Sequence, residues 1–497
     1  ACANYLATAV NQSQEFTQQV GQVFIAGDIF ELPAGPLSTV FGLEYRGFEY
    51  SSRYLSNPGP FSGFNVGNPE AGNNNFKDFF AEALVPIVRD APWAQSLELG
   101  LGYRRSTSEF TDKTRGLSSD SRSSDAYKVD LSWVPLDYAR FRASYQRSVR
   151  APNFGELFAG GVSFPQIFDP CSATSAARNG PNKAAIEALC VATGIPLANL
   201  ATFSATPGVQ AQITTSGNTD LAPEKADTIT LGAVFSSPWG GQWMERFRAS
   251  VDYYDIEIEG PILTPDTNIG IAGCYNYFGT NPNYSASNPY CAGLVRTGGQ
   301  IQRINLLNAP TSPAFPGQNG GVLSTTGLDF QFDWGFDLEW LGADPMWGRI
   351  SSNLLLTHVM TFKQNETPGL PAVDYAGTIS YFGAGLGSSF PEWKATWSTN
   401  WDVGPLNLNV RARYISSMEN RAAVQFVGES FQGVSAVTYW DIAGAYQLND
   451  NVELRLGVNN VGDKQPPTYS PNVQSGTDPS TYDVIGRRVF GQLKLRF

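Results

Sequence analysis

The chain has 497 residues and a formal net charge of −12 at pH 7, with charged residues at only 16% of the composition. That fraction is below the roughly 25% of soluble domains, and the negative balance argues against nucleic acid as a partner. One histidine in the whole chain argues against histidine-based catalysis or metal binding, so we expect no enzyme, no metal site and no cofactor.

No apolar run approaches the ~20 residues of a membrane helix, so any membrane span must be built from strands. The opening residues 1–5 lack the basic region and apolar stretch of a signal peptide. An exported protein needs such a segment. We therefore expect the start of the protein to have been removed from this chain.

The five cysteines are Cys2, Cys171, Cys190, Cys274 and Cys291. The last four form two pairs, each enclosing fewer than about 20 residues of polar, Pro- and Asn-rich sequence. They predict two local disulfides, each contributing ~3 kcal/mol by loop closure, in an oxidising compartment. Unpaired loop thiols are the alternative. Cys2 is left over, and we expect its partner upstream of this chain.

Apolar and polar residues alternate in segments spread along the chain, at residues 97–104, 129–133, 247–253, 328–337, 406–414, 452–458 and 489–497. A strand points successive side chains to opposite faces, so one face of each segment suits hydrocarbon and the other suits water. In the last segment, Leu493, Leu495 and Phe497 share one face. The pattern predicts an all-β fold, an antiparallel transmembrane barrel with a polar lumen.

Fifteen strands are expected, starting near Gln18, Leu37, Phe76, Ser96, Ser124, Ala139, Glu224, Met244, Val322, Gly348, Glu392, Leu406, Ser435, Val452 and Val484. Their connections alternate between short and long. The long ones cover about 53–75, 111–122, 151–222, 260–320, 365–389, 421–433 and 464–483. Outer-membrane barrels have short periplasmic turns and long extracellular loops, and both predicted disulfides fall in long connections.

An odd strand count would leave the two chain ends on opposite sides of the membrane. A complete outer-membrane barrel has both ends in the periplasm and an even count. Either one strand is miscounted, or the chain begins inside an external loop. The second explanation agrees with the unpaired Cys2 and the missing signal peptide.

Three segments carry a family resemblance: 148–158 (SVRAPNFGELF), 221–232 (LAPEKADTITLG), and 458–464 (VNNVGDK) followed by 486–488 and the last strand. In this order and spacing they closely resemble the β-barrel of TonB-dependent outer-membrane receptors, over essentially the whole chain. The motif residues are Arg150, Ala151, Pro152, Asn153, Glu156, Leu157, Phe158, Pro223, Glu224, Asn459, Asn460, Gly486, Arg487 and Phe497.

The resemblance implies a barrel of 22 strands in the bacterial outer membrane, with a plug domain inside it. The fifteen strands would then be strands 8–22, and the plug and the TonB-contacting segment would precede this chain. Phe497 resembles the signal that the barrel-assembly machinery recognises, and lipid contact is its other role. Pro152 and Pro223 would shape where the chain leaves and enters the sheet, because proline lacks a backbone donor.

The function implied is TonB-energised import of a scarce nutrient, such as a ferric chelate, a vitamin or an oligosaccharide. A passive porin, a soluble or surface β-rich binding protein and an enzyme are the rival interpretations. Aromatic residues in the long connections either contact the ligand or pack the loops against each other: Phe164, Phe168, Tyr275, Tyr277, Tyr284 and Tyr290. The lone His358 is interpreted as a strand residue near the membrane interface.

Overall fold

The computed structural model describes residues 11–55, 66–67, 69–158, 161–163, 167–205, 211, 213–239, 244–263, 267–277, 279–304, 314–316, 318–364, 372–379, 389–420, 432–468 and 476–496. Cys2, Phe164 and Phe497 lie outside these residues. None of the described helices has the length and hydropathy needed to cross a membrane.

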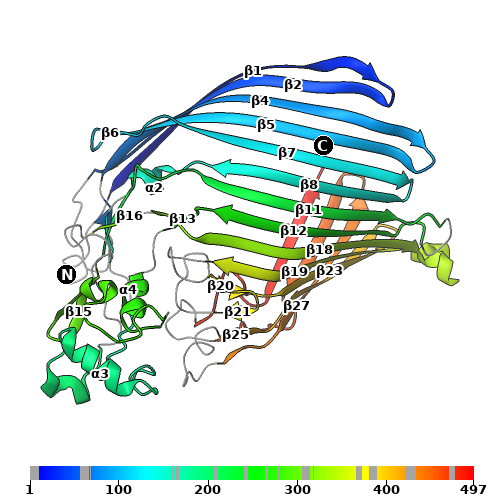
Figure 1. The fold of residues 1–497 in the computed structure, drawn as a ribbon. Helices are drawn as coiled ribbons and strands as arrows, with labels where there is room; N and C mark the ends of the chain where they lie inside the picture. Colours follow the sequence, from blue (N-terminus) through cyan, green and yellow to red (C-terminus); the bar gives the residue numbers. More distant parts are fainter. Residues whose placement is uncertain are drawn as a thin grey trace.

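One antiparallel sheet of long strands dominates the described part of the chain (Figure 1). It contains seventeen strands, of which β6 (Leu117–Ser118) and β20 (Val373–Asp374) are two-residue additions to β5 and β19. The other fifteen follow one another in chain order: β1 (Gln12–Leu32), β2 (Gly35–Tyr54), β4 (Glu70–Ala91), β5 (Ala94–Asp112), β7 (Arg122–Leu136), β8 (Ala139–Arg150), β11 (Glu224–Ser236), β12 (Arg248–Glu259), β18 (Val322–Asp337), β19 (Arg349–Gln364), β23 (Trp393–Val403), β24 (Leu406–Ile415), β27 (Val437–Asn449), β28 (Val452–Asn459) and β29 (Arg488–Leu495). These are the fifteen predicted strands.

Several predicted strand starts were wrong by a few residues. β1 begins at Gln12 rather than Gln18, because its ladder with β2 continues up to the pair Gln12–Tyr54. β29 begins at Arg488 rather than Val484, because the backbone before it is held in a separate turn in which the Arg487 amide donates to Asp463. Alternation of apolar and polar residues alone does not reveal how far strand pairing continues or where a local turn replaces it.

The sheet is a single layer whose two faces differ in chemistry. Cross-strand partners of β12 and β18 pair apolar with apolar residues, as in Val251–Phe330, and polar with polar residues, as in Asp252–Asp329. The apolar side chains stay exposed: Leu456 on β28 retains 57% of its surface. A soluble monomer does not normally carry so much exposed apolar surface, but a lipid-facing wall requires it.

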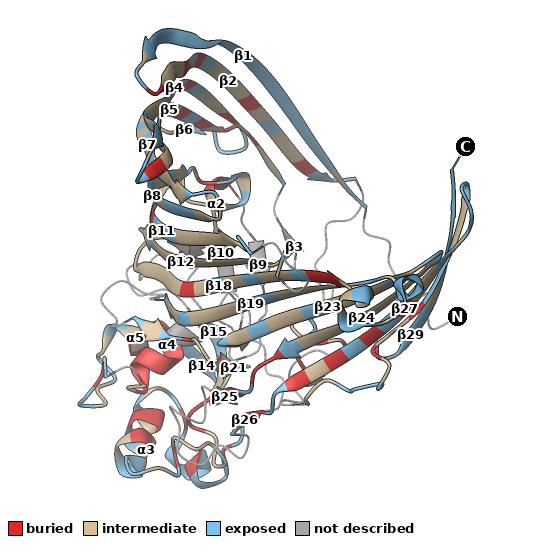
Figure 2. Ribbon diagram, turned by 90° about the vertical axis from the view of Figure 1, so that its right-hand side faces the viewer, coloured by how far each residue is buried: buried red, intermediate tan, exposed pale blue. Residues whose placement is uncertain are grey.

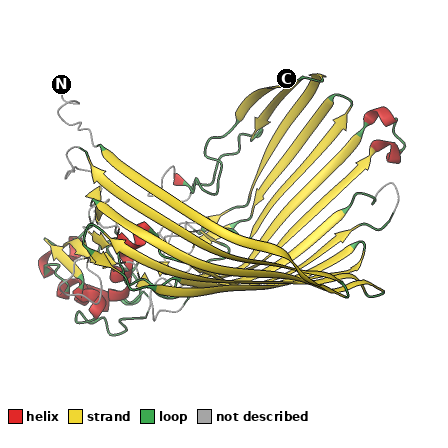
Figure 3. Ribbon diagram, turned by 90° about the horizontal axis from the view of Figure 1, so that it is seen from above, coloured by secondary structure: helices red, strands yellow, loops and turns green. Residues whose placement is uncertain are grey.

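The sheet curves around its polar face, which we call the inner face (Figures 1 and 3). β1 and β29 are its two edges, and the described strands include no pairing between them. Short turns such as Leu32–Gly35 and Val403–Leu406 join strands at one end, and the long connections gather at the other.

Two long connections, after β8 and after β12, fold together beyond that end into a compact body, here called the loop unit (residues 167–205, 267–277 and 279–304). It contains α3 (Lys183–Ala192), η1 (Leu197–Thr202), α4 (Thr267–Cys274), α5 (Pro289–Ala292) and the hairpin β14 (Leu294–Thr297)–β15 (Gln300–Ile304). Figure 2 shows buried residues on α3 and α4, whereas most of the wall is intermediate or exposed, with buried patches on strands such as β27.

Shorter elements complete the connections. Beside the main sheet lie β3 (Val66–Gly67), β9 (Gly161–Ser163), β10 (Ile213–Ser216) and β16 (Ala314–Pro316) in one small sheet, β13 (Ile262–Leu263) with β17 (Gln318–Asn319), and β21 (Thr378–Ile379), β22 (Ser389–Phe390), β25 (Met418–Asn420) and β26 (Gly433–Val434) in another. The remaining helical turns are α2 (Phe154–Phe158), η2 (Leu338–Leu341) and η3 (Pro345–Trp347).

Candidate functional site

Both predicted disulfides are confirmed in the loop unit. Cys171 is bonded to Cys190 and Cys274 to Cys291, with sequence separations of 19 and 17 residues. All four cysteines are buried in one apolar cluster that also contains Ile186, Leu189, Ile195, Leu200, Phe203, Ala211, Ile271, Tyr275, Leu294, Ile301 and Ile304. Each disulfide closes a ring within one connection, and the shared core joins the two connections.

A buried ion pair crosses between the two connections. Arg296 donates to both carboxylate oxygens of Asp169, at 2.6 and 2.9 Å, and the two side chains are only 1% and 2% exposed. Burial by itself would lower the pKa of Arg296, but the hydrogen bonds to Asp169 raise that pKa above its ordinary value. Arg296 also donates to the Tyr275 hydroxyl at 3.2 Å, which ties this aromatic ring into the same network.

The described loop aromatics, for which ligand contact and loop packing were the two expectations, pack against one another and the core. Tyr275 is 2% exposed, and Phe168, Tyr277, Tyr284 and Tyr290 lie against the same cluster. Phe168 and Tyr277 form an edge-to-face pair with centroids 5.5 Å apart. Burial raises the pKa of Tyr275, Tyr277 and Tyr290. In this arrangement the rings stabilise the loop unit.

The first motif forms a charged clasp where β8 leaves the sheet. Arg150 pairs with Glu156 at 2.8 Å and also with Glu224 at the start of β11. Asn153 and Glu156 cap α2 reciprocally: the Asn153 amide donates to the Glu156 carboxylate at 2.7 Å, and the Glu156 amide donates to Asn153 Oδ1 at 2.9 Å. Pro152 is buried beside this clasp, and Ala151 packs against the neighbouring Phe110 cluster.

The helical turn that follows lies over the inner face of the first strands. Leu157 is fully buried, and Phe158 packs with Phe110 of β5. Phe154 contacts Tyr50 of β2, with centroids 5.4 Å apart, and Phe16 of β1 at 6.5 Å. The motif thus anchors the start of a long connection against β1, β2 and β5 at the loop end of the sheet.

The third motif is a turn between β28 and β29. Asn460 is fully buried with φ 49°, and its amide donates to Asp441 of β27 at 2.8 Å. Its side chain closes the turn through both backbone groups of Lys464. At Gly486, φ is 78° and a Cβ would lie 2.8 Å from Asp463 Oδ1, so a side chain would strain this position.

The remaining motif residues also lie at strand ends. Asn459 pairs in register with Arg488, and Arg487 donates its amide to Asp463. Pro223 directly precedes β11. All described motif residues therefore lie where strands meet long connections.

Charges on the inner wall are cross-linked between strands. Arg46 and Arg104 share Glu44 and Asp78, with Arg46–Asp78 at 2.9 Å and Arg104–Glu44 at 2.6 Å. On later strands of the sheet, Arg142 of β8 donates three hydrogen bonds of 2.7–2.9 Å to the carboxylate of Asp252 on β12. Such multiple hydrogen bonds fix guanidinium groups against a water-facing wall.

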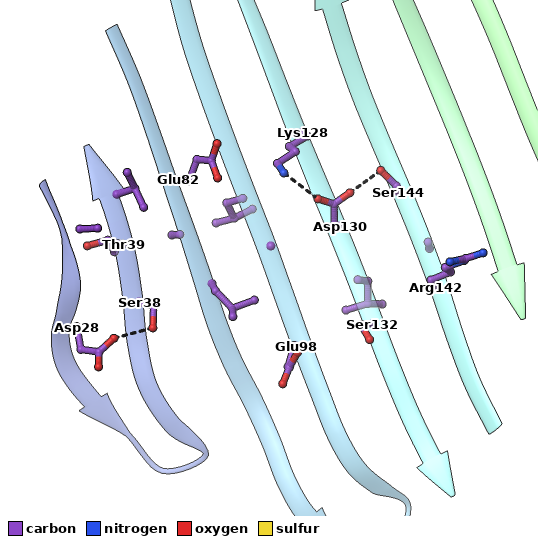
Figure 4. A pocket seen from close by; sticks show the side chains of 18 of the residues that line it. Asp28, Ser38, Thr39, Glu82, Glu98, Lys128, Asp130, Ser132, Arg142 and Ser144 are labelled. Carbon is purple, nitrogen blue, oxygen red and sulfur yellow. Dashed lines mark hydrogen bonds and ion pairs between the residues drawn. The ribbon is translucent and has the colours of Figure 1, made fainter. Parts of the chain in front are cut away.

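A cavity of about 720 Å³ opens on the inner face of β1–β8 (Figure 4). Asp130 accepts from Ser144 at 2.6 Å and faces Lys128 at 3.7 Å. Glu82 and Glu98 also line the cavity and have no hydrogen bond or ion pair among the described residues. The cavity therefore offers two unengaged carboxylates together with hydroxyl groups and the cations Lys128, Arg140 and Arg142, a surface suited to a polar ligand.

Sequence reasoning did not find the inner-wall cavity or the Asp169–Arg296 pair. The two members of that pair are 127 residues apart, and neither lies in a recognisable motif. His358, in contrast, lies within β19 as expected, stacked on Trp393 with ring centroids 3.9 Å apart. The described residues contain no group of three His, Cys, Asp or Glu side chains arranged to hold a metal ion.

Residues 3–461 match a family model described as "TonB dependent receptor-like, beta-barrel". Among solved structures, a double mutant of the Serratia marcescens hemophore receptor HasR in complex with its hemophore HasA and heme is 14% identical, with a TM-score of 0.55, covering 98% of this chain and 60% of that one. The ferric citrate transporter FecA has 13% identity, TM-score 0.54, and coverage of 98% and 55%. The copper transporter OprC has 12% identity, TM-score 0.52, and coverage of 98% and 57%.

No curated protein has a matching sequence. At these identities the solved structures show a shared fold, and the chain spans about three fifths or less of their lengths. The fold they share with this chain is that of the large antiparallel sheet described above.

Proposed function

Since this chain belongs to the TonB-dependent receptor family, whose β-barrel it represents, we propose that it forms the wall and mouth of an importer for a scarce nutrient. The barrel lies in the bacterial outer membrane with its long loops outside the cell, and the family consists of receptors and transporters rather than enzymes. The nutrient is a ferric chelate, a vitamin or an oligosaccharide, bound by the external loops and the inner wall. No bond of the nutrient is broken during import.

The observation that carries this proposal is the combination of a polar inner wall with folded structure at its loop end. The wall offers charges and hydroxyls around a cavity of about 720 Å³, large enough for a small nutrient. Beyond it, the α2 turn packs inward and the loop unit forms a compact body with a core and two disulfides. Such a mouth favours selective capture of a ligand.

A passive porin is the alternative function. It requires only a water-filled lumen with an open mouth. The inward position of Phe154 and Phe158 against β1, β2 and β5, together with the family membership, favours a receptor over such a channel.

The proposal includes three further partners. TonB, driven by the inner-membrane proton gradient, would supply the energy for import by displacing a plug domain from the barrel. The barrel-assembly machinery would recognise the C-terminal strand, and the outer wall would contact membrane lipid.

Uptake in cells tests the proposal. Cells that produce the full protein should accumulate one of three radiolabelled probes, a panel of ferric chelates, cobalamin or oligosaccharides, and should lose this uptake when TonB is deleted. Accumulation that persists undiminished without TonB would contradict energised import and favour the porin. The probe that is taken up identifies the nutrient class.

A further inference from the structure

The wall is taller on one side than a bilayer requires. β1, β2, β4 and β5 contain 21, 20, 22 and 19 residues, whereas a strand crosses the hydrocarbon with about 9–11 residues. Towards the long connections their outward rows become polar, as in Gln19–Gly47–Asn75–Glu109 and Thr17–Glu49–Asn73–Thr111. This part of the sheet, here called the projecting sheet (residues 12–20, 46–54, 70–76 and 108–112), therefore extends beyond the membrane.

On the projecting sheet the apolar side chains point inward instead of outward. Its inner rows are Phe16–Tyr50–Gly72–Asp112, Gln18–Phe48–Asn74–Phe110 and Val20–Arg46–Phe76–Ser108. The rings form a ladder across the four strands, with centroids 5.9 Å apart for Phe16–Phe48 and for Phe48–Phe76, and 6.1 Å for Phe76–Phe110. Lower on the same strands the apolar rows face outward, as in Val23–Leu43–Phe79. The reversal presents aromatic surface to the lumen rather than to lipid.

The α2 turn covers only part of this aromatic ladder. Phe154 lies against Tyr50 and Phe16, with ring centroids 5.4 and 6.5 Å away. Phe16 nevertheless remains 58% exposed on β1, the edge of the described sheet, and Phe48 and Phe76 inside the sheet are only half-buried. Packing between α2 and the sheet therefore leaves ring surface available at the mouth.

The polar groups beside the rings are uncharged amides on β1. Four glutamines face inward from that strand: Gln12, Gln14, Gln18 and Gln22. Gln12 donates to Ser52 at 2.8 Å and Gln22 donates to Glu44 at 3.2 Å. Gln14 and Gln18 have no hydrogen bond from their side chains within the described part of the chain. Each of these two carboxamides can both donate and accept hydrogen bonds.

The charged groups next to the ladder neutralise one another. The guanidinium of Arg46 lies 5.3 Å from the centre of the Phe76 ring and pairs with Asp78 at 2.9 Å and Glu44 at 2.8 Å. Arg104 pairs with the same two carboxylates. Two cations balanced by two anions leave no surplus positive charge at this surface for an anionic chelate, which favours an uncharged ligand.

We propose that the projecting sheet binds a neutral oligosaccharide, with sugar rings stacked on Phe16 and Phe48 and hydroxyl groups bonded to Gln14 and Gln18. A pyranose ring has an apolar C–H face that fits a flat aromatic ring, and its hydroxyls donate and accept as a carboxamide does. The row from Gln14 to Gln18 spans about 13 Å at 3.3 Å per residue, which suits several linked sugars. This inference rests on the proposed import function and selects one of its three nutrient classes.

Binding to the purified full protein in detergent tests the site, with maltohexaose and cellohexaose as neutral probes. Isothermal titration calorimetry should show that the wild type binds at least one of them. The Phe16→Leu, Gln18→Ala double variant should weaken this binding about tenfold, because one stacking ring and one amide are lost. Phe16→Tyr keeps a ring at the same position and should bind within about twofold of the wild type.

A matched control separates the site from general effects on β1. Gln19→Ala removes the next amide along the strand, which points outward. This variant should retain wild-type affinity, and thermal unfolding should show that every variant is folded. Binding of neither oligosaccharide by the wild type, or equal binding by the double variant, would overturn the proposal.

Uptake in cells distinguishes a failure of this site from a failure of the import function. TonB-dependent accumulation of a radiolabelled oligosaccharide that falls in the double variant would support both. TonB-dependent uptake of cobalamin or a ferric chelate, unchanged in the double variant and without oligosaccharide uptake, would overturn the oligosaccharide site and leave the importer intact. Oligosaccharide binding that is lost in the double variant, combined with uptake that persists without TonB, would support the site and contradict energised import.

Discussion

The wall and the loop unit place their apolar side chains in opposite environments. The wall is one layer thick, and residues such as Leu231 and Leu456 project outward at 52% and 57% exposure. The loop unit buries Ile186, Leu189 and Ile271 almost completely around two disulfides. The wall relies on surrounding lipid to cover its apolar side chains, whereas the loop unit buries its own in an internal core. The comparison shows that a single chain is folded against two different solvents, so equal substitutions should have unequal effects in the two regions.

The largest effect is expected at the buried pair of the loop unit. Arg296→Met leaves Asp169 buried without its cation, which should destabilise the loop unit by ~3–5 kcal/mol. Hydrogen exchange should show lost protection in residues 167–205 and 267–304, with the strands unchanged. The matching wall variant Arg349→Met removes a half-exposed partner of Asp337 and should change little. Equal losses of stability in both variants would mean that ion pairs contribute alike in the wall and in the loop unit.

A charge on the outward face should affect the wall alone. Leu231→Arg places a guanidinium in the middle of the lipid-facing side of β11, at an expected cost of ~2–4 kcal/mol in unfolding free energy. Thr230→Arg, on the next residue and the opposite face, points towards water and should be tolerated. Unfolding in lipid vesicles, followed by tryptophan fluorescence, measures both. A wall that tolerates Leu231→Arg as well would not be facing hydrocarbon there.

Removing one disulfide should affect the loop unit alone. Cys171→Ser with Cys190→Ser opens a ring with a sequence separation of 19 residues, which should cost about 3 kcal/mol by loop-closure entropy. Limited proteolysis should then cut within 167–205 while the strands stay intact. Unchanged resistance to protease would show that the apolar core suffices without the crosslink.

The smallest effect is expected at the junction between the two regions. Asn153→Ala removes one half of the reciprocal cap of α2 and should cost about 1 kcal/mol. Asn153→Asp keeps an acceptor at the same position and serves as the control. Hydrogen exchange at the amide of Glu156 reports the loss, and equal exchange in both variants would argue against a capping role.

The wall was largely predictable from sequence because its signal is local. Alternation of apolar and polar residues over about ten positions identifies each strand, and the fifteen predicted strands are present. The disulfides were predictable because their partners are close in sequence. The fold of the loop unit was not, because contacts such as Asp169–Arg296 join distant residues without a periodic pattern. The inner-wall cavity depends on which residues of adjacent strands lie opposite each other. Alternation assigns each side chain to one face of the sheet but does not determine its cross-strand partner.

The placement of the disulfides also sets where the loop unit can come apart. Both rings close within a single connection, and among the described residues no disulfide crosses from one connection to the other. The boundary between the two halves is therefore a non-covalent seam, held by the shared apolar core and the Asp169–Arg296 pair. Under a mechanical load applied to the mouth, the two halves would separate along that seam as intact pieces, and could reassemble without any change in covalent bonding.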